Sequence, residues 1–234
     1  MKTNLSKGEL AKRIDHTILK PNADWIRVKQ VCEEAVNYNF RGCCIPPIYL
    51  KRAKEIVSTG KVRLVTVVGF PLGYSLGEVK VAEVERCIQQ GADDVDMVMS
   101  ISLFKSGETD IVRKEIEKAA EIAHSYGAAL KVIIETSLLT PSEIVKASEL
   151  VVSAGADFVK TNTGFGTRGV APSDVMLIKK ATAYSGIKIK AAGGIRTALD
   201  ALLYISLGAD VIGTSSGVKI INEYDSLLST VQQS

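Results

Sequence analysis

The sequence contains only two histidines, His16 and His124, and its four cysteines show no metal-ligand spacing. A zinc site with three histidine ligands cannot be built from this set. No C-x-x-C pair is present either, so neither a redox motif nor a disulfide framework is indicated. We therefore expect no metal site, and we expect free buried thiols at Cys32, Cys43, Cys44 and Cys87.

Long hydrophobic runs and basic tracts are also missing. No apolar run is long enough to span a bilayer, and the opening residues MKTNLSKGELAKR contain neither an apolar core nor a cleavage site of a signal peptide. The net charge of +3 mildly favours small anionic substrates, but no basic run is interleaved with aromatic residues. We expect a cytoplasmic protein without membrane or nucleic-acid partners.

The 234 residues, 46% of them hydrophobic, can bury one sizeable core, and no linker divides residues 1–234. Glycines that resemble helix C-caps recur before apolar segments, at intervals of about thirty residues, the length of one strand and its return helix. Eight such units fit the chain. The predicted strands lie at residues 13–16, 42–45, 63–68, 93–98, 130–135, 157–161, 187–191 and 210–213.

The segments between these strands have helical periodicity. A short helix is expected before the first strand, and another helix begins at Pro141. A further helix is predicted from Leu76 to Gln90, with an apolar face formed by Val79, Ala82, Val84 and Ile88.

Polar residues gather on one face of certain strands. Asp94 and Asp96 share a face of strand 93–98, whose opposite face is apolar, and Lys188 and Lys190 share a face of a later strand. An open doubly wound sheet has the same alternation of strands and helices. A polar interior with an apolar exterior favours a closed barrel, so we predict an α/β fold, a single-domain (β/α)8 TIM barrel.

Two lysines stand where an apolar strand runs into a glycine-rich turn, Lys160 in DFVKTNTGFGTRG and Lys190 in IKIKAAGGIR. A lysine amine attacks a carbonyl only when it is unprotonated, and a second cation nearby favours the neutral form. This repeated context points to Schiff-base chemistry. The alternative is that both are strand-end lysines that extend into solvent.

Glycine-rich turns follow the last two predicted strands. Gly193 and Gly194 follow the seventh, and Gly213, Ser215 and Ser216 follow the eighth. In barrels of this type these two loops often hold a phosphate through backbone N–H groups and hydroxyls. The alternative is that they are ordinary turns and helix caps.

A G-x-G-x-x-G pattern at Gly164, Gly166 and Gly169 does not indicate a dinucleotide site. In such a site the helix opens within the glycines and the next strand ends in an acidic residue. Here Pro172 begins the helix after the pattern, and the next strand ends in Lys190. No Walker A sequence is present, which argues against a nucleoside triphosphate substrate.

Asp96 ends its strand and could pair with Lys190 across the barrel to shuttle protons. A buried structural ion pair is an equal alternative on sequence alone. Lys188 lies two residues deeper than Lys190, and its pairing with Asp94 is a hypothesis.

Seven segments in their order and spacing, together with the strand end at Cys44, resemble the deoxyribose-phosphate aldolase family over nearly the whole chain. These are class I aldolases of the (β/α)8 type. The matching segments are IDHTILKP at 14–21, VVGFPLG at 67–73, DDVDMV at 93–98, KVIIET at 131–136, FVKTNTGF at 158–165, KAAGGIRT at 190–197 and GTSSG at 213–217.

The resemblance implies reversible cleavage of 2-deoxy-D-ribose 5-phosphate to acetaldehyde and D-glyceraldehyde 3-phosphate, without a cofactor, by a homodimer or higher homo-oligomer. It implies that Lys160 forms the Schiff base, that Lys190 lowers its pKa and transfers protons, and that Asp96 acts with Lys190 as acid and base. The implied phosphate contacts are Gly164, Gly193, Gly194, Gly213, Ser215 and Ser216. Asp15, Thr17, Cys44 and Thr163 are expected to line the substrate site.

Two positions depart from the family pattern. Asn162 replaces a serine that the family often has in the turn after Lys160. Pro46 precedes Pro47 where the family commonly has an asparagine after the cysteine. Asn162 keeps donor and acceptor capacity, whereas Pro46 lacks a backbone N–H, so the range of acceptors is left open. Two other functions compete: a related lysine aldolase acting on another sugar phosphate, and a phosphate-binding barrel without turnover.

Overall fold

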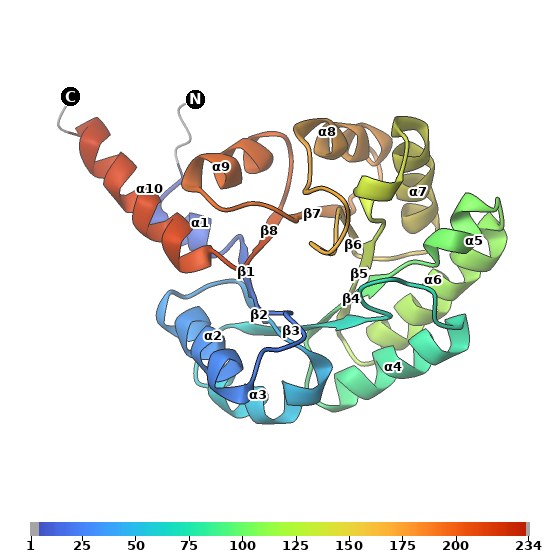
Figure 1. Ribbon diagram of the computed structural model, residues 1–234, viewed down its shortest axis with the longest axis horizontal. Coiled ribbons are helices and arrows are strands. Elements are labelled where there is room, and N and C mark those ends of the chain that lie inside the picture. The colour runs from blue at the N-terminus through green and yellow to red at the C-terminus, as the bar shows by residue number, and fades with distance from the viewer. Residues whose placement is uncertain (1–4, 233–234) are drawn as a thin grey trace.

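Eight parallel strands close into one barrel in the computed structural model, which describes residues 5–232 (Figure 1). Strand β1 pairs with both β2 and β8, which closes the sheet. The predicted (β/α)8 barrel is confirmed; the outermost parts of the predicted domain, residues 1–4 and 233–234, lie outside the described residues. The strands are β1 (Ile14–Thr17), β2 (Gly42–Cys44), β3 (Arg63–Val68), β4 (Asp94–Val98), β5 (Ala129–Ile133), β6 (Phe158–Lys160), β7 (Lys188–Ala192) and β8 (Val211–Thr214).

Helices surround the barrel, and several begin where the sequence carries a cap. The short helix predicted before β1 is present, and a capping box of Ser6 and Glu9 starts it. Thr140 caps the helix that begins at Pro141. The helices are α1 (Lys7–Ala11), α2 (Trp25–Asn37), α3 (Leu50–Val57), α4 (Gly77–Gln89), α5 (Ile101–Lys105), α6 (Thr109–Ser125), α7 (Pro141–Ser153), α8 (Pro172–Ala181), α9 (Ala198–Ser206) and α10 (Gly217–Gln232), with 3-10 turns at Pro47–Tyr49 and Thr136–Leu138. Among residues 5–232 no helix is both long and apolar enough to cross a membrane.

The predicted apolar face of α4 is partly wrong. Val79 is 51% exposed and Ala82 is also exposed, while the buried side is formed by Lys80, Val84, Cys87 and Ile88. The Lys80 amine donates hydrogen bonds to two backbone oxygens and to the hydroxyl of Ser100, and it pairs with Glu115 of α6 at 2.7 Å. A lysine occupies this core position because its charge and donors are satisfied there.

The main hydrophobic core lies between the barrel and its helices. Val95 and Met97 of β4, together with Met99, which follows the strand, point outward and are fully buried, as the alternation predicts. Each such side chain contributes about 1.5–3 kcal/mol through its burial. All four cysteines are free and buried, which confirms the thiol prediction.

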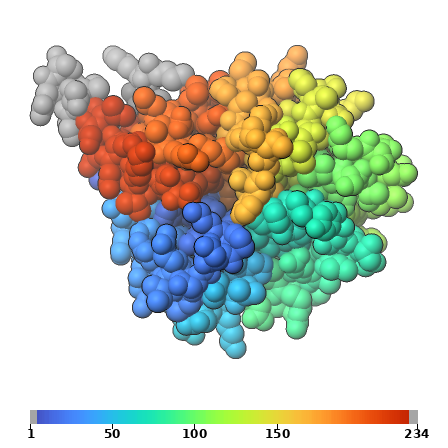
Figure 2. Space-filling view, viewed as in Figure 1, coloured from blue at the N-terminus to red at the C-terminus, as the bar shows by residue number. Residues whose placement is uncertain are grey.

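Loops at the carboxyl ends of the strands meet over one end of the barrel. Segments that follow β1 (dark blue), β3 (teal) and β6 (orange) come together on the face seen in Figure 2. The rings of Phe70, after β3, and Phe165, after β6, contact edge to face with centroids 5.4 Å apart. This contact joins the loops after β3 and β6 at the same end of the barrel as Lys160, the last residue of β6.

Candidate active site

Lys160 and Lys190 are register partners on neighbouring strands β6 and β7. Equivalent positions of paired strands direct their side chains to the same side of a sheet, and both lysines enter the barrel. Lys160 is 3% exposed and Lys190 is 1% exposed. They do not extend into solvent, which removes the structural alternative considered from sequence.

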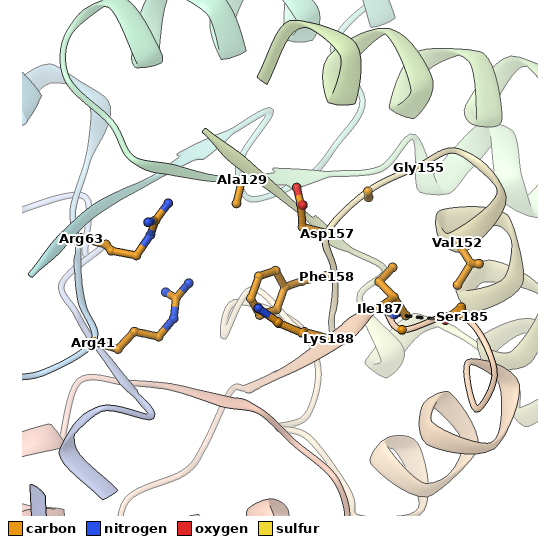
Figure 3. Close-up of a pocket in the computed structure, with 12 residues that line it drawn as sticks. Arg41, Arg63, Ala129, Val152, Gly155, Asp157, Phe158, Ser185, Ile187 and Lys188 are labelled. Carbon is orange, nitrogen blue, oxygen red and sulfur yellow. Dashed lines mark hydrogen bonds between the residues drawn. The ribbon is translucent and has the colours of Figure 1, made fainter. Parts of the chain in front are cut away.

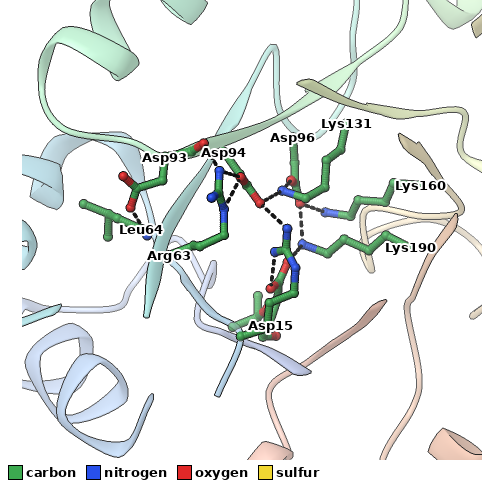
Figure 4. A network of polar contacts seen from close by, with 11 residues as sticks. Asp15, Arg63, Leu64, Asp93, Asp94, Asp96, Lys131, Lys160 and Lys190 are labelled. Carbon is green, nitrogen blue, oxygen red and sulfur yellow. Dashed lines mark hydrogen bonds and ion pairs between the residues drawn. The ribbon is translucent and has the colours of Figure 1, made fainter. Parts of the chain in front are cut away.

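One carboxylate oxygen receives both amines. Lys160 Nζ lies 2.8 Å and Lys190 Nζ 2.7 Å from Oδ2 of Asp96, and the Lys131 amine donates to the other oxygen, Oδ1, at 3.0 Å (Figure 4). The predicted pairing of Asp96 with Lys190 is therefore present. Three strands, β4, β6 and β7, supply the aspartate and the two predicted lysines.

Asp15, expected only to line the site, is a full member of this cluster. Its Oδ2 accepts from Lys190 at 2.6 Å, and its Oδ1 accepts from Arg41 at 2.8 Å. Thr17, two residues later, turns its hydroxyl back to the carbonyl oxygen of Asp15 at 2.9 Å. The Thr17 hydroxyl donor is thus committed to the backbone.

The hypothesis that Lys188 pairs with Asp94 is wrong. Lys188 is exposed and lies 5.6 Å from the centroid of the Phe158 ring. Asp94 instead pairs with Arg41 and Lys131, at 2.8 and 2.6 Å, and with Arg63. Lys188 is the first residue of β7, at one end of the barrel, whereas Lys131 belongs to β5, the strand that pairs directly with the β4 strand of Asp94.

Sequence reasoning missed Lys131, Arg41 and Arg63. Lys131 could have been found, because it is a charged residue inside an otherwise apolar strand, as Asp94 is in its own strand. Arg41 and Arg63 stand at the entries to β2 and β3, where a charged residue usually faces solvent. Their long side chains cross the end of the barrel to reach the buried carboxylates.

The buried cluster of aspartates and lysines keeps Asp96 and Lys190 in their charged forms. Burial raises the pKa of Asp96, but Lys131, Lys160 and Lys190 outweigh it and hold that pKa well below its usual range. Burial lowers the pKa of Lys190, yet Asp15 and Asp96 raise it overall, so Lys190 stays protonated. The Cys44 thiol faces the same interior, and burial raises its pKa to about 11. Cys44 is therefore a neutral thiol rather than a nucleophile.

These shifts predict acid sensitivity. Burial raises the pKa values of Asp15, Asp94 and Asp96, but neighbouring cations lower all three overall. Their contribution to stability is present above the unfolded-state pKa of about 3.9 and is lost as the pH falls towards the folded-state values. We expect the melting temperature to fall steeply between about pH 5 and pH 2, and Asp94→Asn to melt lower at neutral pH with a shallower acid slope. Thermal melts by circular dichroism check this, and an unchanged slope in Asp94→Asn contradicts it.

Five of the six predicted phosphate-binding residues, all except Gly213, lie on the loops at the same end of the barrel as Lys160. Gly193 and Gly194 follow β7 with φ of +100° and +83°, and a Cβ on Gly193 would come within 3.1 Å of Cβ of Asn162. Gly164, with φ of +87°, is exposed in the loop after β6. Ser215 is exposed and Ser216 half-buried, directly before α10.

Gly213 and Thr163 have other contacts that account for them. Gly213 lies inside β8, where a Cβ would come within 3.0 Å of Cε of Lys190, so this glycine leaves room for the lysine. The backbone N–H and hydroxyl of Thr163 both donate to the carboxylate of Glu135, at 2.9 and 2.6 Å. In this conformation neither Thr163 donor is available to a substrate.

A cavity of about 620 Å³ lies at the opposite end of the barrel (Figure 3). Phe158 and Lys188 line it, and they are the first residues of β6 and β7. Arg41 and Arg63 also face it while they pair with buried aspartates. Active sites of (β/α)8 enzymes lie at the carboxyl ends of the strands, so the chemistry is expected at Lys160 and not in this cavity.

The closed barrel and the two lysine amines on one aspartate oxygen place this chain among the (β/α)8-barrel enzymes with buried lysines in their active site. Residues 10–224 match the model of the DeoC/LacD family aldolases, and the chain belongs to this family.

Known proteins agree with this assignment. Deoxyribose-phosphate aldolase of Thermococcus gammatolerans is 48% identical over 91% of this chain and 95% of its own length. That of Thermoanaerobacter sp. strain X514 is 47% identical over 93% of this chain and 98% of its own. The tetrameric structure of deoxyribose phosphate aldolase from Aeropyrum pernix matches with a TM-score of 0.89 and 37% identity, covering 95% of this chain and 93% of that one.

Proposed function

We propose that this chain cleaves 2-deoxy-D-ribose 5-phosphate reversibly to acetaldehyde and D-glyceraldehyde 3-phosphate through a Schiff base on Lys160. The observation that carries the proposal is the pair of buried amines, Lys160 and Lys190, held on Oδ2 of Asp96 inside the barrel, with Lys160 at the carboxyl end of β6. The 46–48% identity to several deoxyribose-phosphate aldolases supports the substrate.

The reaction begins when Lys160, as the neutral amine, attacks the C1 aldehyde and water leaves, which forms an iminium ion. The iminium accepts the electron pair of the C2–C3 bond as a base takes the proton of the C3 hydroxyl. D-glyceraldehyde 3-phosphate departs and an enamine remains on Lys160. Protonation at C2 and hydrolysis release acetaldehyde and restore the amine.

Asp96 and Lys190 suit the proton transfers. In the free enzyme Asp96 faces the amines of Lys131, Lys160 and Lys190, which keep it ionised. When Lys160 loses its proton, one of these cations is gone, and the proton affinity of the carboxylate rises. Lys190 remains protonated beside Asp15 and Asp96, so it supplies a fixed positive charge and a proton donor next to the nucleophile.

The phosphate end of the substrate is assigned to the loops after β6, β7 and β8. Gly164, Gly193 and Gly194 have positive φ angles, as in turns whose backbone N–H groups bind anions, and the loop bearing Ser215 and Ser216 leads into the N-terminus of α10. Binding energy from the phosphate would hold C3 near its base.

Borohydride trapping tests the proposal. The protein incubated with acetaldehyde and sodium borohydride is expected to gain an ethyl group, and peptide mapping is expected to find it on Lys160 and not on Lys190. Product assays with 2-deoxy-D-ribose 5-phosphate complete the test. An adduct on another lysine, or cleavage without any adduct, contradicts the assignment.

The same experiment separates the two competing functions. A phosphate-binding barrel without turnover would give no adduct and no products. A lysine aldolase for another sugar phosphate would turn over a different substrate and would not use acetaldehyde as its donor.

We also propose that the chain forms a homo-oligomer. Leu72, Tyr74 and Leu76 lie close together in sequence after β3 and are 55%, 71% and 66% exposed. Neighbouring exposed apolar side chains of this kind are typical of protein interfaces. The tetrameric structure of the Aeropyrum pernix relative supports the same conclusion.

A further inference from the structure

Glu135 has an unusual backbone and an unusual environment. It follows β5 by two residues, its φ is +52°, and it is 2% exposed. A left-handed conformation is unfavourable for a residue with a side chain and persists only where surrounding contacts hold it. The contacts of the Glu135 side chain and backbone therefore explain why this conformation is present.

The carboxylate of Glu135 accepts four hydrogen bonds from neutral donors. Oε2 accepts from the backbone N–H of Thr163 at 2.9 Å and from its hydroxyl at 2.6 Å. Oε1 accepts from Nδ2 of Asn162 at 2.8 Å and from the hydroxyl of Ser137 at 2.6 Å. Within residues 5–232 no cation forms an ion pair with Glu135, so these donors compensate for its burial.

The backbone on either side of Glu135 holds the strand end that carries the nucleophile. The N–H of Ile134 donates to the carbonyl oxygen of Lys160, and the N–H of Thr136 donates to that of Thr161, both at 3.0 Å. The left-handed turn at Glu135 lies between these two bonds. It turns the side chain over the loop after β6 while both bonds to the neighbouring strand persist.

The contacts continue into the next loop. Cβ of Asn162 packs against Gly193, and the N–H of Val170 donates to the carbonyl oxygen of Gly193 at 3.0 Å. Gly166 also passes so close to Glu135 that a Cβ there would lie 2.6 Å from Oε1. One buried carboxylate thus fixes the loop after β6, and through Asn162 it supports the turn after β7.

We propose that Glu135 is a positioning residue that sets the loops after β6 and β7 for the phosphate end of the substrate. The inference rests on the proposed function, because these loops include Gly164, Gly193 and Gly194. Loss of the carboxylate leaves Lys160 and Asp96 in contact with their own partners and disturbs the phosphate loops. The effect is therefore on binding of a phosphorylated substrate more than on carbon–carbon chemistry.

Glu135→Gln tests the proposal, because the glutamine amide must oppose one of the donor pairs that the carboxylate accepts. We expect the KM for 2-deoxy-D-ribose 5-phosphate to rise about 10-fold, the equivalent of one or two lost hydrogen bonds. We expect kcat/KM for unphosphorylated 2-deoxy-D-ribose to change by less than about 2-fold. Glu149→Gln, an exposed glutamate on α7, is the matched control and should alter neither value.

Borohydride trapping on each variant separates this proposal from the proposed function. If the natural protein forms no adduct on Lys160, the proposed function fails. If Glu135→Gln forms the adduct but loses activity equally with both substrates, or loses none, the positioning role is overturned. If Glu135→Gln does not fold, Thr163→Val takes its place. This variant removes one hydroxyl donor to Glu135 and keeps the backbone N–H, and it should show the same selective rise in the KM for 2-deoxy-D-ribose 5-phosphate.

Discussion

Lys160→Met is expected to lower kcat for 2-deoxy-D-ribose 5-phosphate at least about 10⁴-fold, because it removes the amine that forms the iminium ion. The fold should survive, since Asp96 keeps two of its three cations, Lys131 and Lys190. Steady-state cleavage assays with circular dichroism of the same samples provide the measurement.

Lys188→Met is the matched control for this variant. Lys188 stands on the strand next to that of Lys160, is exposed and pairs with no carboxylate in the described part of the chain. Its replacement should leave kcat and melting temperature nearly unchanged. Retention of more than a trace of activity in Lys160→Met would assign the nucleophile to another residue.

Asp96→Asn is expected to reduce kcat by about 10²- to 10⁴-fold, the usual contribution of a proton-transfer group. It also leaves the amines of Lys131, Lys160 and Lys190 around a neutral side chain, which should cost about 3–5 kcal/mol of stability. Activity must therefore be measured at a temperature where circular dichroism shows the variant to be folded.

This variant decides between the two roles that the sequence leaves open for Asp96. A proton shuttle predicts a large loss of kcat per folded molecule, whereas a structural ion pair predicts lower stability with normal turnover. Asp93→Asn is the control, because Asp93 directly precedes the strand of Asp96 and pairs outside the barrel with Lys54 at 2.9 Å. It should affect stability slightly and kcat not at all.

Much of the fold follows from local patterns in the sequence. The apolar residues of each strand and the glycines before them placed the strand ends within one residue of those in the structure, except for the end of the fifth strand, which was predicted at residue 135 and lies at Ile133. The left-handed turn at Glu135 ends that strand early, and nothing in the segment KVIIET announces it. Glutamate has no preference for positive φ, so only the contacts to Asn162 and Thr163 account for it.

The candidate site divides in the same way. Lys160, Lys190 and Asp96 could be selected from sequence because each is a charged residue in an apolar strand. Lys160 ends its strand as predicted, whereas Asp96 and Lys190 lie in the middle of β4 and β7 and not at their ends. The partners of Asp15 and Asp94 could not, because Arg41 and Arg63 reach them from the entries to other strands.

The sequence by itself determined the eight alternating strands and helices of the barrel and the identity of the lysines, because these depend on short-range periodicity and on residue type. Only the tertiary structure decided which charges meet in the interior and which carboxylate fixes the loops. Those pairings depend on side-chain reach across a closed barrel, between residues as far apart in sequence as Asp15 and Lys190.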